Sequence, residues 1–101
     1  MTLKLGVLAL LTAKPGKEAE LAAFLDAGRA VVEDEPGTRI WYAFQVDSAT
    51  FGIFDAFADE DARQAHLTGR IPAALAEVGP ELLATAPDIR VVDVLATKNP
   101  S

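Results

Sequence analysis

The sequence predicts an α+β fold in which helices cover one side of a four-stranded antiparallel sheet. Three observations predict it: turn signals divide the chain at regular intervals, apolar residues recur at helical spacing, and other segments are rich in aromatic and β-branched residues. The chain has 101 residues, of which 50% are apolar and 24% are charged. This composition is typical of a globular protein, and we expect a single domain over residues 1–101.

The first half of the chain contains a predicted strand, helix and strand. Residues 5–13 form an apolar run that ends at a Lys-Pro-Gly turn, which is typical of a buried strand. Residues 16–33 have the periodicity of an amphipathic helix, which the Pro-Gly pair at 36–37 ends. Its apolar stripe contains Leu21, Phe24, Leu25 and Gly28. Residues 39–46 are aromatic and β-branched, which favours a second strand.

The second half repeats the pattern. Residues 50–57 form a third strand, joined to the second by a short polar link that makes a hairpin. Asp59 is a suitable N-cap for a helix that runs towards Gly69, and further helical segments extend to Leu83. Residues 89–97 form the last strand. The order β-α-β-β-α-β is that of a ferredoxin-like fold.

The hairpin loop decides which residues face each other. A two-residue loop at Ser48-Ala49 places Tyr42 opposite Asp55, whereas a three-residue loop reverses the pairing. Trp41 and Tyr42 are neighbours in a strand and therefore point to opposite faces. One of them lines the space under the helices and the other lines a subunit interface. Both are candidate substrate-binding residues, and the sequence leaves open which faces the pocket.

Both faces of the predicted sheet are apolar, although the chain has helices for only one. Residues 7–11 and 40–44 are apolar at odd and even positions, and only Asp93 interrupts residues 91–95. An exposed apolar sheet of this size is unusual in a soluble monomer. We therefore expect a homodimer in which two sheets pack face to face. The alternative is that loops and extra helical turns cover the second face.

Composition and charge exclude several classes of function. A net charge of −6 makes the chain a poor binder of nucleic acid or of an anionic membrane surface. It has no cysteine and one histidine, and it lacks HExxH or EF-hand spacing, so we expect no metal site. The acidic run Glu33-Asp34-Glu35 is interpreted as a solvated helix end. The apolar run of residues 5–11 is too short for a membrane span, and we expect a cytoplasmic protein.

His66 is a candidate catalytic residue. On the second predicted helix it shares a stripe with small residues, which is expected to face the sheet and to leave room for a ligand. These small residues are Ala62, Ala65 and Gly69. The functional interpretation is a base or a hydrogen-bond donor to a bound small molecule. The alternative is a core histidine bonded to a backbone carbonyl.

Asp55 interrupts an otherwise apolar strand. A carboxylate in such a strand has to be paired or has to serve a site. Arg63, one turn into the next helix, is the candidate partner. A structural Asp55–Arg63 pair and a catalytic role for Asp55 both stay open.

Together these residues resemble the antibiotic biosynthesis monooxygenase family of dimeric α+β barrels. The resemblance spans about residues 4–98, and the Glu-Pro-Gly-Thr turn and the His-bearing helix are its most specific parts. The segments that carry it are Ala13-Lys14-Pro15-Gly16-Lys17, Glu35-Pro36-Gly37-Thr38, Trp41-Tyr42-Ala43-Phe44, Phe51-Gly52-Ile53-Phe54-Asp55 and Ala65-His66-Leu67. It identifies the fold better than the reaction, because the superfamily also includes haem-degrading enzymes and isomerases.

The resemblance implies a cofactor-independent monooxygenase acting on a small aromatic, phenolic or quinol substrate. Such enzymes need no metal or bound flavin, because the deprotonated substrate passes an electron to O2 in a dry pocket. Residue by residue, His66 matches the histidine on the family's helix. Asp55 matches a position where many relatives have Glu or Asp, and Trp41 matches a position where many have an aromatic residue. This implies His66 as base or hydrogen-bond partner, Asp55 as its polar support and Trp41 as a pocket wall, with Arg63 a weaker candidate.

Two alternatives stay open. The first is a non-catalytic small-molecule-binding or structural dimer, which an Asp55–Arg63 pair and a backbone-bonded His66 would favour. The second is haem binding, which the sequence favours less. The strand-end Trp of the haem-degrading branch would fall near Phe57, and its first-strand Asn would fall within residues 5–11, which contain none. Phe57 is kept among the candidate substrate-binding residues.

Overall fold

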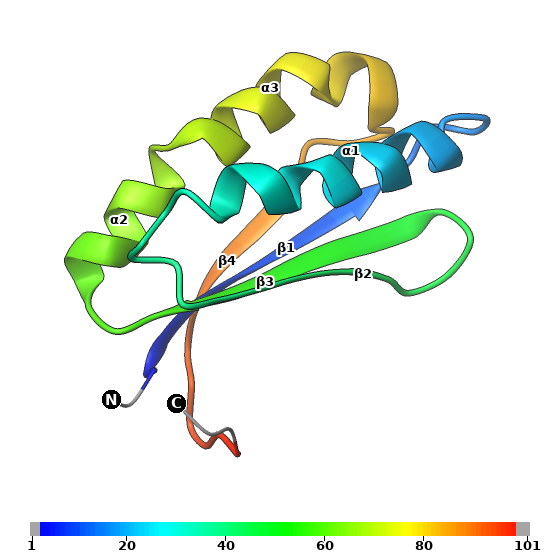
Figure 1. The fold of residues 1–101 in the computed structure, drawn as a ribbon. Helices are drawn as coiled ribbons and strands as arrows, with labels where there is room; N and C mark the ends of the chain where they lie inside the picture. Colours follow the sequence, from blue (N-terminus) through cyan, green and yellow to red (C-terminus); the bar gives the residue numbers. More distant parts are fainter. Residues whose placement is uncertain (1–2, 99–101) are drawn as a thin grey trace.

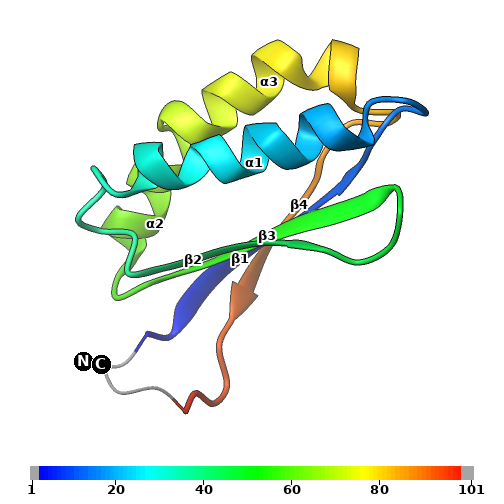
Figure 2. The same ribbon diagram turned by 45° about the vertical axis from the view of Figure 1, so that its right-hand side comes forward.

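The computed structural model describes residues 3–98, and it has the predicted order of elements (Figure 1). These are β1 (Leu5–Thr12), α1 (Glu18–Val32), β2 (Ile40–Gln45), β3 (Thr50–Phe57), α2 (Glu60–Leu67), α3 (Arg70–Leu82) and β4 (Asp88–Asp93). The strands form one antiparallel sheet in the order β2-β3-β1-β4, which is the ferredoxin-like arrangement. The sheet of one chain is open, with β2 and β4 at its edges, and the helices lie on one side of it (Figure 2).

The β2–β3 hairpin has the three-residue loop. The Val46 N–H donates to the Thr50 carbonyl at 2.8 Å, and the side chain of Asp47 accepts from the N–H groups of the loop. Trp41 therefore pairs with Asp55. Side chains directly opposite in antiparallel strands share a face, so Trp41 lies on the helix side and its neighbour Tyr42 on the other.

Two predicted boundaries were wrong. The last strand ends at Asp93 and not at Thr97, because its partner strand β1 begins at Leu5. The Val94 N–H still bonds to the Lys4 carbonyl at 2.7 Å, and the chain then leaves the sheet (Figure 1). The helical segments expected from Pro72 and from Pro80 are one helix, α3. Pro72 lies in its first turn, where a missing N–H removes no intrahelical hydrogen bond.

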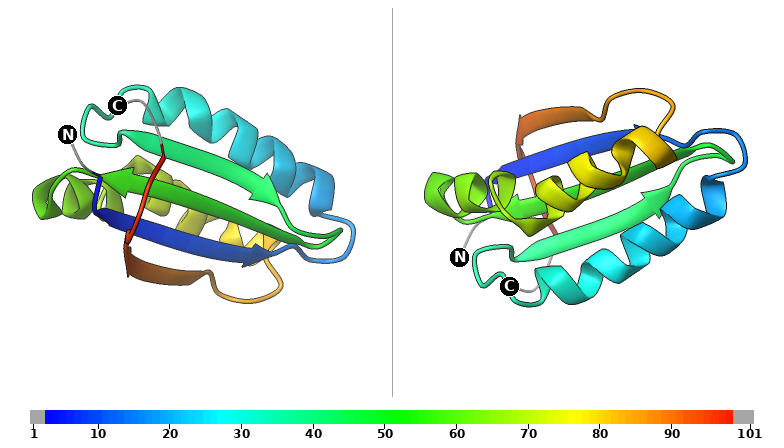
Figure 3. Two further views of the ribbon diagram at one scale, coloured as in Figure 1. Left: turned by 90° about the horizontal axis from the view of Figure 1, so that it is seen from below. Right: turned by 90° about the horizontal axis from the view of Figure 1, so that it is seen from above.

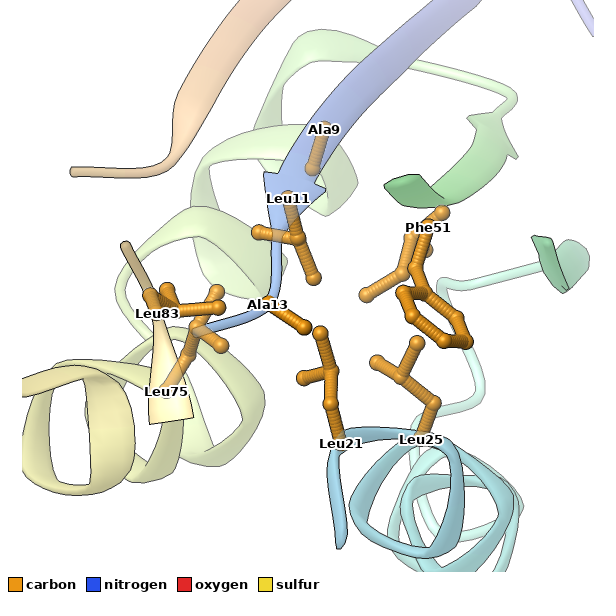
Figure 4. Packing of buried hydrophobic residues seen from close by; sticks show 9 residues of the cluster. Ala9, Leu11, Ala13, Leu21, Leu25, Phe51, Leu75 and Leu83 are labelled. Carbon is orange, nitrogen blue, oxygen red and sulfur yellow. The ribbon is translucent and has the colours of Figure 1, made fainter. Parts of the chain in front are cut away.

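The hydrophobic core lies between the helix-covered face of the sheet and the helices α1 and α3 (Figure 4). β1 and β3 supply the odd-numbered residues of the sheet side, as the period of two requires. Trp41 and Phe24 pack at the margin of the cluster. The buried members are Ala9, Leu11, Ala13, Leu21, Leu25, Phe51, Ile53, Leu75 and Leu83.

The opposite face of the sheet is apolar and, within residues 3–98, no helix covers it (Figure 3, left). Tyr42, Phe44 and Val46 of this face are exposed, with 62% of Tyr42 accessible. On the helix side, α3 does not extend over β4 (Figure 3, right), which leaves Ile89 and Val91 exposed as well.

Candidate functional site

The centre of the candidate site is an ion pair between α2 and β3. Asp59 caps α2 as predicted, accepting from the Ala62 N–H at 2.8 Å. This fixes the start of the helix, and His66 near its other end points onto the sheet, where 5% of it is exposed. Its Nε2 atom lies 2.9 Å from Oδ2 of Asp55, which is 1% exposed. The structure thus brings the two predicted catalytic residues together.

Glu35 is a member of the site that the sequence interpretation missed. Its Oε1 atom lies 2.7 Å from Nδ1 of His66 and accepts a hydrogen bond from the Thr38 hydroxyl at 2.8 Å. The interpretation of this residue as part of a solvated helix end was therefore wrong, since only 21% of its side chain is exposed. The arrangement is a linear chain from Asp55 through His66 to Glu35 and Thr38.

A close approach of the backbone brings Glu35 to this position. The turn of residues 35–38 packs directly on α2, and a Cβ atom placed on Gly37 would lie 2.9 Å from Cβ of Ala62. A glycine against a helical alanine is therefore what lets the turn reach the helix. The Glu-Pro-Gly-Thr segment was visible in the sequence, but its spacing does not indicate which helix it contacts.

The two carboxylates control the protonation of His66. Burial by itself lowers the pKa of this imidazole, but the hydrogen bonds to Asp55 and then Glu35, together with their charges, raise the pKa above its ordinary value. In the protonated form, Nε2 donates to Asp55 and Nδ1 donates to Glu35. The two carboxylates therefore favour the imidazolium form of His66.

Arg63 does not pair with Asp55, so that predicted alternative was wrong. Its guanidinium donates to the carboxylate of Glu60, at 2.5 and 3.1 Å, and to the backbone carbonyls of Gly6 and Val92, at 3.4 and 3.3 Å. It is 7% exposed and ties α2 to β1 and β4. The sequence could not separate these partners, because Arg63 lies close along the chain to both acidic residues.

The three aromatic candidate residues lie in different parts of the structure. Phe57 is fully buried, and its ring centroid lies 5.3 Å from that of His66 at a tilt of 42°. Trp41 is on the helix side of the sheet, where its indole packs across from Gly28. Tyr42 points to the opposite face, away from His66.

Three spaces flank this group, and one of them, of about 310 Å³, borders Glu35, Thr38 and His66 directly. A groove of about 570 Å³ runs between the second half of α1 and β2, with Leu25 and Arg29 on one wall, Trp41 on the other and Glu35 near one end. A much smaller cavity, of about 30 Å³, borders Asp55 and His66. Its other walls are apolar: Val7, Ala9, Ile53, Leu67, Ile71, Pro72, Leu75 and Ile89.

Two buried side-chain atoms near these spaces have no hydrogen-bond partner in the described part of the chain: Oδ1 of Asp55 and Nε1 of Trp41. Over residues 3–98, no group of three or more His, Cys, Asp or Glu side chains is placed to hold a metal ion. Nor is any helix in that range long and apolar enough to cross a membrane.

Comparison with known proteins gives a consistent family. The family model described as "Antibiotic biosynthesis monooxygenase" matches residues 5–77. The chain is 47% identical to the protein NE2512 of unknown function from Nitrosomonas europaea, with a TM-score of 0.94 over 98% of this chain and 96% of that one. No curated protein sequence matches it.

Two further solved structures are more distant. PA3566 from Pseudomonas aeruginosa is 26% identical, with a TM-score of 0.80 over 95% of this chain and 98% of that one. A protein from Caulobacter crescentus CB15 described as a "putative antibiotic biosynthesis monooxygenase" is 28% identical, with a TM-score of 0.77 over 93% and 92%.

Proposed function

This chain belongs to the antibiotic biosynthesis monooxygenase family, and on that premise we propose that it is a cofactor-independent monooxygenase of a small aromatic, phenolic or quinol substrate. One observation carries the proposal: the buried Asp55–His66–Glu35 chain has an unpaired carboxylate oxygen at its Asp55 end, and its Glu35 end borders a groove large enough for an aromatic ring. The description of the similar Caulobacter protein supports the same reaction class.

The geometry favours roles for Asp55 and His66 that differ from those the sequence suggested. Both nitrogens of His66 are engaged with carboxylates, so neither is free to take a proton from a substrate. The free acceptor is Oδ1 of Asp55. Asp55 is therefore the proposed base. His66 is a positioning residue that holds the other oxygen of Asp55, and Glu35 positions His66.

The chemistry needs nothing from the protein beyond a base and a dry pocket. Loss of the phenolic proton gives an anion that can pass an electron to O2. For a ring CH2 group, two C–H bonds break, a C=O bond forms, and the second oxygen atom leaves as water. The substrate supplies all four electrons, so no external reductant is required.

Oxygen consumption tests the proposal. We expect purified protein to consume O2 with at least one member of a panel of quinols and anthrone-type phenols. Asp55→Asn should reduce the rate by about 10²–10⁴-fold, the range for loss of a general base. His66→Ala should also reduce it, whereas Asp61→Asn, a matched change on the exposed surface of α2, should not. Absence of O2 uptake across the panel would contradict the proposal and favour a non-catalytic binding protein.

We also propose that two copies form a homodimer through the helix-free face of the sheet. This face presents an apolar surface with exposed Tyr42, Phe44 and Val46. A second copy related by a two-fold axis offers the same surface and would cover it. Two open sheets stacked in this way would complete the predicted α+β barrel.

A further inference from the structure

We propose that Trp41 and Asp55 together form a recognition site for one aromatic hydroxyl group. In this site Nε1 of Trp41 donates to the hydroxyl oxygen, and Oδ1 of Asp55 accepts the hydroxyl proton. The inference rests on the proposed function only for the class of ligand, a hydroxyarene.

The two atoms are buried groups without a hydrogen-bond partner among the described residues, and one is a donor while the other is an acceptor. In native proteins nearly all buried polar groups have a hydrogen-bond partner, and an unpaired one calls for an explanation. Within residues 3–98 only two side-chain atoms are buried and unpaired, and these are the indole donor of Trp41 and one acceptor of Asp55. The other oxygen of Asp55 is held by His66 at 2.9 Å.

The two residues are also cross-strand neighbours in the sheet. Trp41 lies directly opposite Asp55 in the β2–β3 pair, and both point to the helix side. Residues opposite each other in antiparallel strands have Cβ atoms about 4.5–5.5 Å apart. The two side chains therefore start close together on one face of the sheet, as a single small group bonded to both of them requires.

The chemistry of that group follows from the pair. It has to accept from an N–H and donate to a carboxylate through the same small centre. A hydroxyl does both, whereas a carbonyl, an ether or a carboxylate can only accept. The site therefore selects the protonated phenol or quinol, the form from which Asp55 would remove a proton.

The spaces on either side of this residue pair concern how a ligand would reach it. Trp41 borders the groove of about 570 Å³, and Asp55, directly opposite in the sheet, borders the cavity of about 30 Å³, so each residue of the pair lines one of the two spaces. Both unpaired atoms are shut off from solvent, so binding of a hydroxyl requires a side chain to move, and partly buried Trp41 is the one of the two that lines the groove. Gly28 across from the indole has no side chain, and a Cβ atom there would lie 3.4 Å from the Trp41 ring.

Binding of matched ligands tests the site. Hydroquinone and 1,4-dimethoxybenzene share a ring and two oxygen acceptors, but only hydroquinone donates. By anaerobic titration calorimetry we expect hydroquinone to bind at least about tenfold more tightly, because a site with an unmet acceptor rejects a ligand that cannot donate. Trp41 is the only tryptophan, so its fluorescence should change with the same dissociation constant.

The two variants should differ in pattern. Asp55→Asn should lower the preference for hydroquinone over its ether at least threefold, since it weakens the acceptor. Trp41→Phe should weaken both ligands by roughly 3–10-fold, the value of one hydrogen bond, and leave their ratio unchanged. Asp61→Asn, on the exposed side of α2, should change neither affinity. If Asp55→Asn does not fold, Trp41→Phe alone tests the site, through the equal loss of affinity for both ligands.

Three outcomes would overturn the inference. The first is that hydroquinone does not bind at millimolar concentration. The second is that the two ligands bind with equal affinity. The third is that Asp55→Asn keeps the preference for hydroquinone, which would mean that the ether is excluded by its size alone. Binding is measured without O2, so it is independent of turnover. Selective binding without oxygen uptake would defeat the proposed function and leave this site intact, and oxygen uptake without selectivity would do the reverse.

Discussion

Both faces of the sheet are rich in apolar residues, but over residues 3–98 helices cover only one of them (Figure 3). On the helix side, the odd-numbered residues of β1 and β3 pack against α1 and α3, and one polar group, Asp55, lies among them. On the other side, Tyr42 and Phe44 of β2 are exposed, and 62% of Tyr42 is accessible.

The two faces differ in whether helices cover them and not in the kind of residue that they present. Trp41 and Tyr42 are adjacent aromatic residues, yet one packs at the margin of the core and the other faces solvent. Burial of the helix side keeps the Asp55–His66 pair out of water, as the proposed removal of a proton would require. The free side has no such group in its centre, and its apolar surface is suited to association.

The largest expected effect concerns the free face. Tyr42→Asp should convert the proposed dimer to a monomer, because a two-fold interface would bury two unpaired carboxylates at roughly 3–5 kcal/mol each. Tyr42 is exposed in one chain, so the monomer should still fold. Light scattering after size exclusion measures the mass. Ala23→Asp on the exposed surface of α1 is the control and should stay dimeric. A monomeric wild type at micromolar concentration would contradict the dimer.

Local patterns predicted most of the fold. The apolar run of β1, the helical stripe of α1 and the Asp59 cap of α2 each follow from interactions within a few residues, and each was confirmed. The predicted end of β4 was wrong because it depends on where the partner strand β1 begins, at Leu5, which is far away along the chain.

The site was only partly predictable for the same reason. Asp55 and His66 stand out because each is a polar residue in an apolar pattern. Glu35 does not, since an acidic residue after a helix is usually solvated, and its role depends on how closely Gly37 approaches Ala62. The hairpin register depended on one residue of loop length, which the sequence left open between two pairings.

On the covered face, His66→Ala should lower the free energy of unfolding by about 3–5 kcal/mol. The substitution leaves Asp55, which is 1% exposed, as a buried carboxylate without its partner. Urea denaturation at fixed protein concentration measures the change, since dimerisation would add to stability. Gln64→Ala, on the exposed side of α2, should cost less than about 1 kcal/mol. A loss that small in His66→Ala would mean that the pair contributes little.

A smaller effect is expected where the turn meets α2. Gly37→Ala should destabilise the protein by about 1–3 kcal/mol, because the new methyl group overpacks against Ala62 at 2.9 Å. Gly79→Ala is the matched control. A Cβ atom there would lie 3.6 Å from Leu83, an ordinary contact, so its effect should be below about 1 kcal/mol. Chemical denaturation of both variants is the measurement.

The same change should also move Glu35 away from the imidazole. The single histidine gives one Hε1 signal in NMR spectra, so its titration reports the pKa of His66 directly. In Gly37→Ala this pKa should be lower than in the wild type, because one of the carboxylates that raise it is displaced. An unchanged titration in a destabilised Gly37→Ala would show that the turn is not what holds Glu35.

The smallest effect is the pH dependence of stability. Because the pKa of His66 is raised in the folded state, the stabilisation is complete below the pKa of the unfolded chain and is lost as pH rises through the folded-state pKa. The free energy of unfolding should therefore fall from about pH 6 upwards, by at most about 1.4 kcal/mol per pH unit for one proton. In His66→Gln the same range should be flatter. Parallel curves for the wild type and His66→Gln would show that the two carboxylates do not hold His66 protonated, and that the covered face differs from the free one in packing alone.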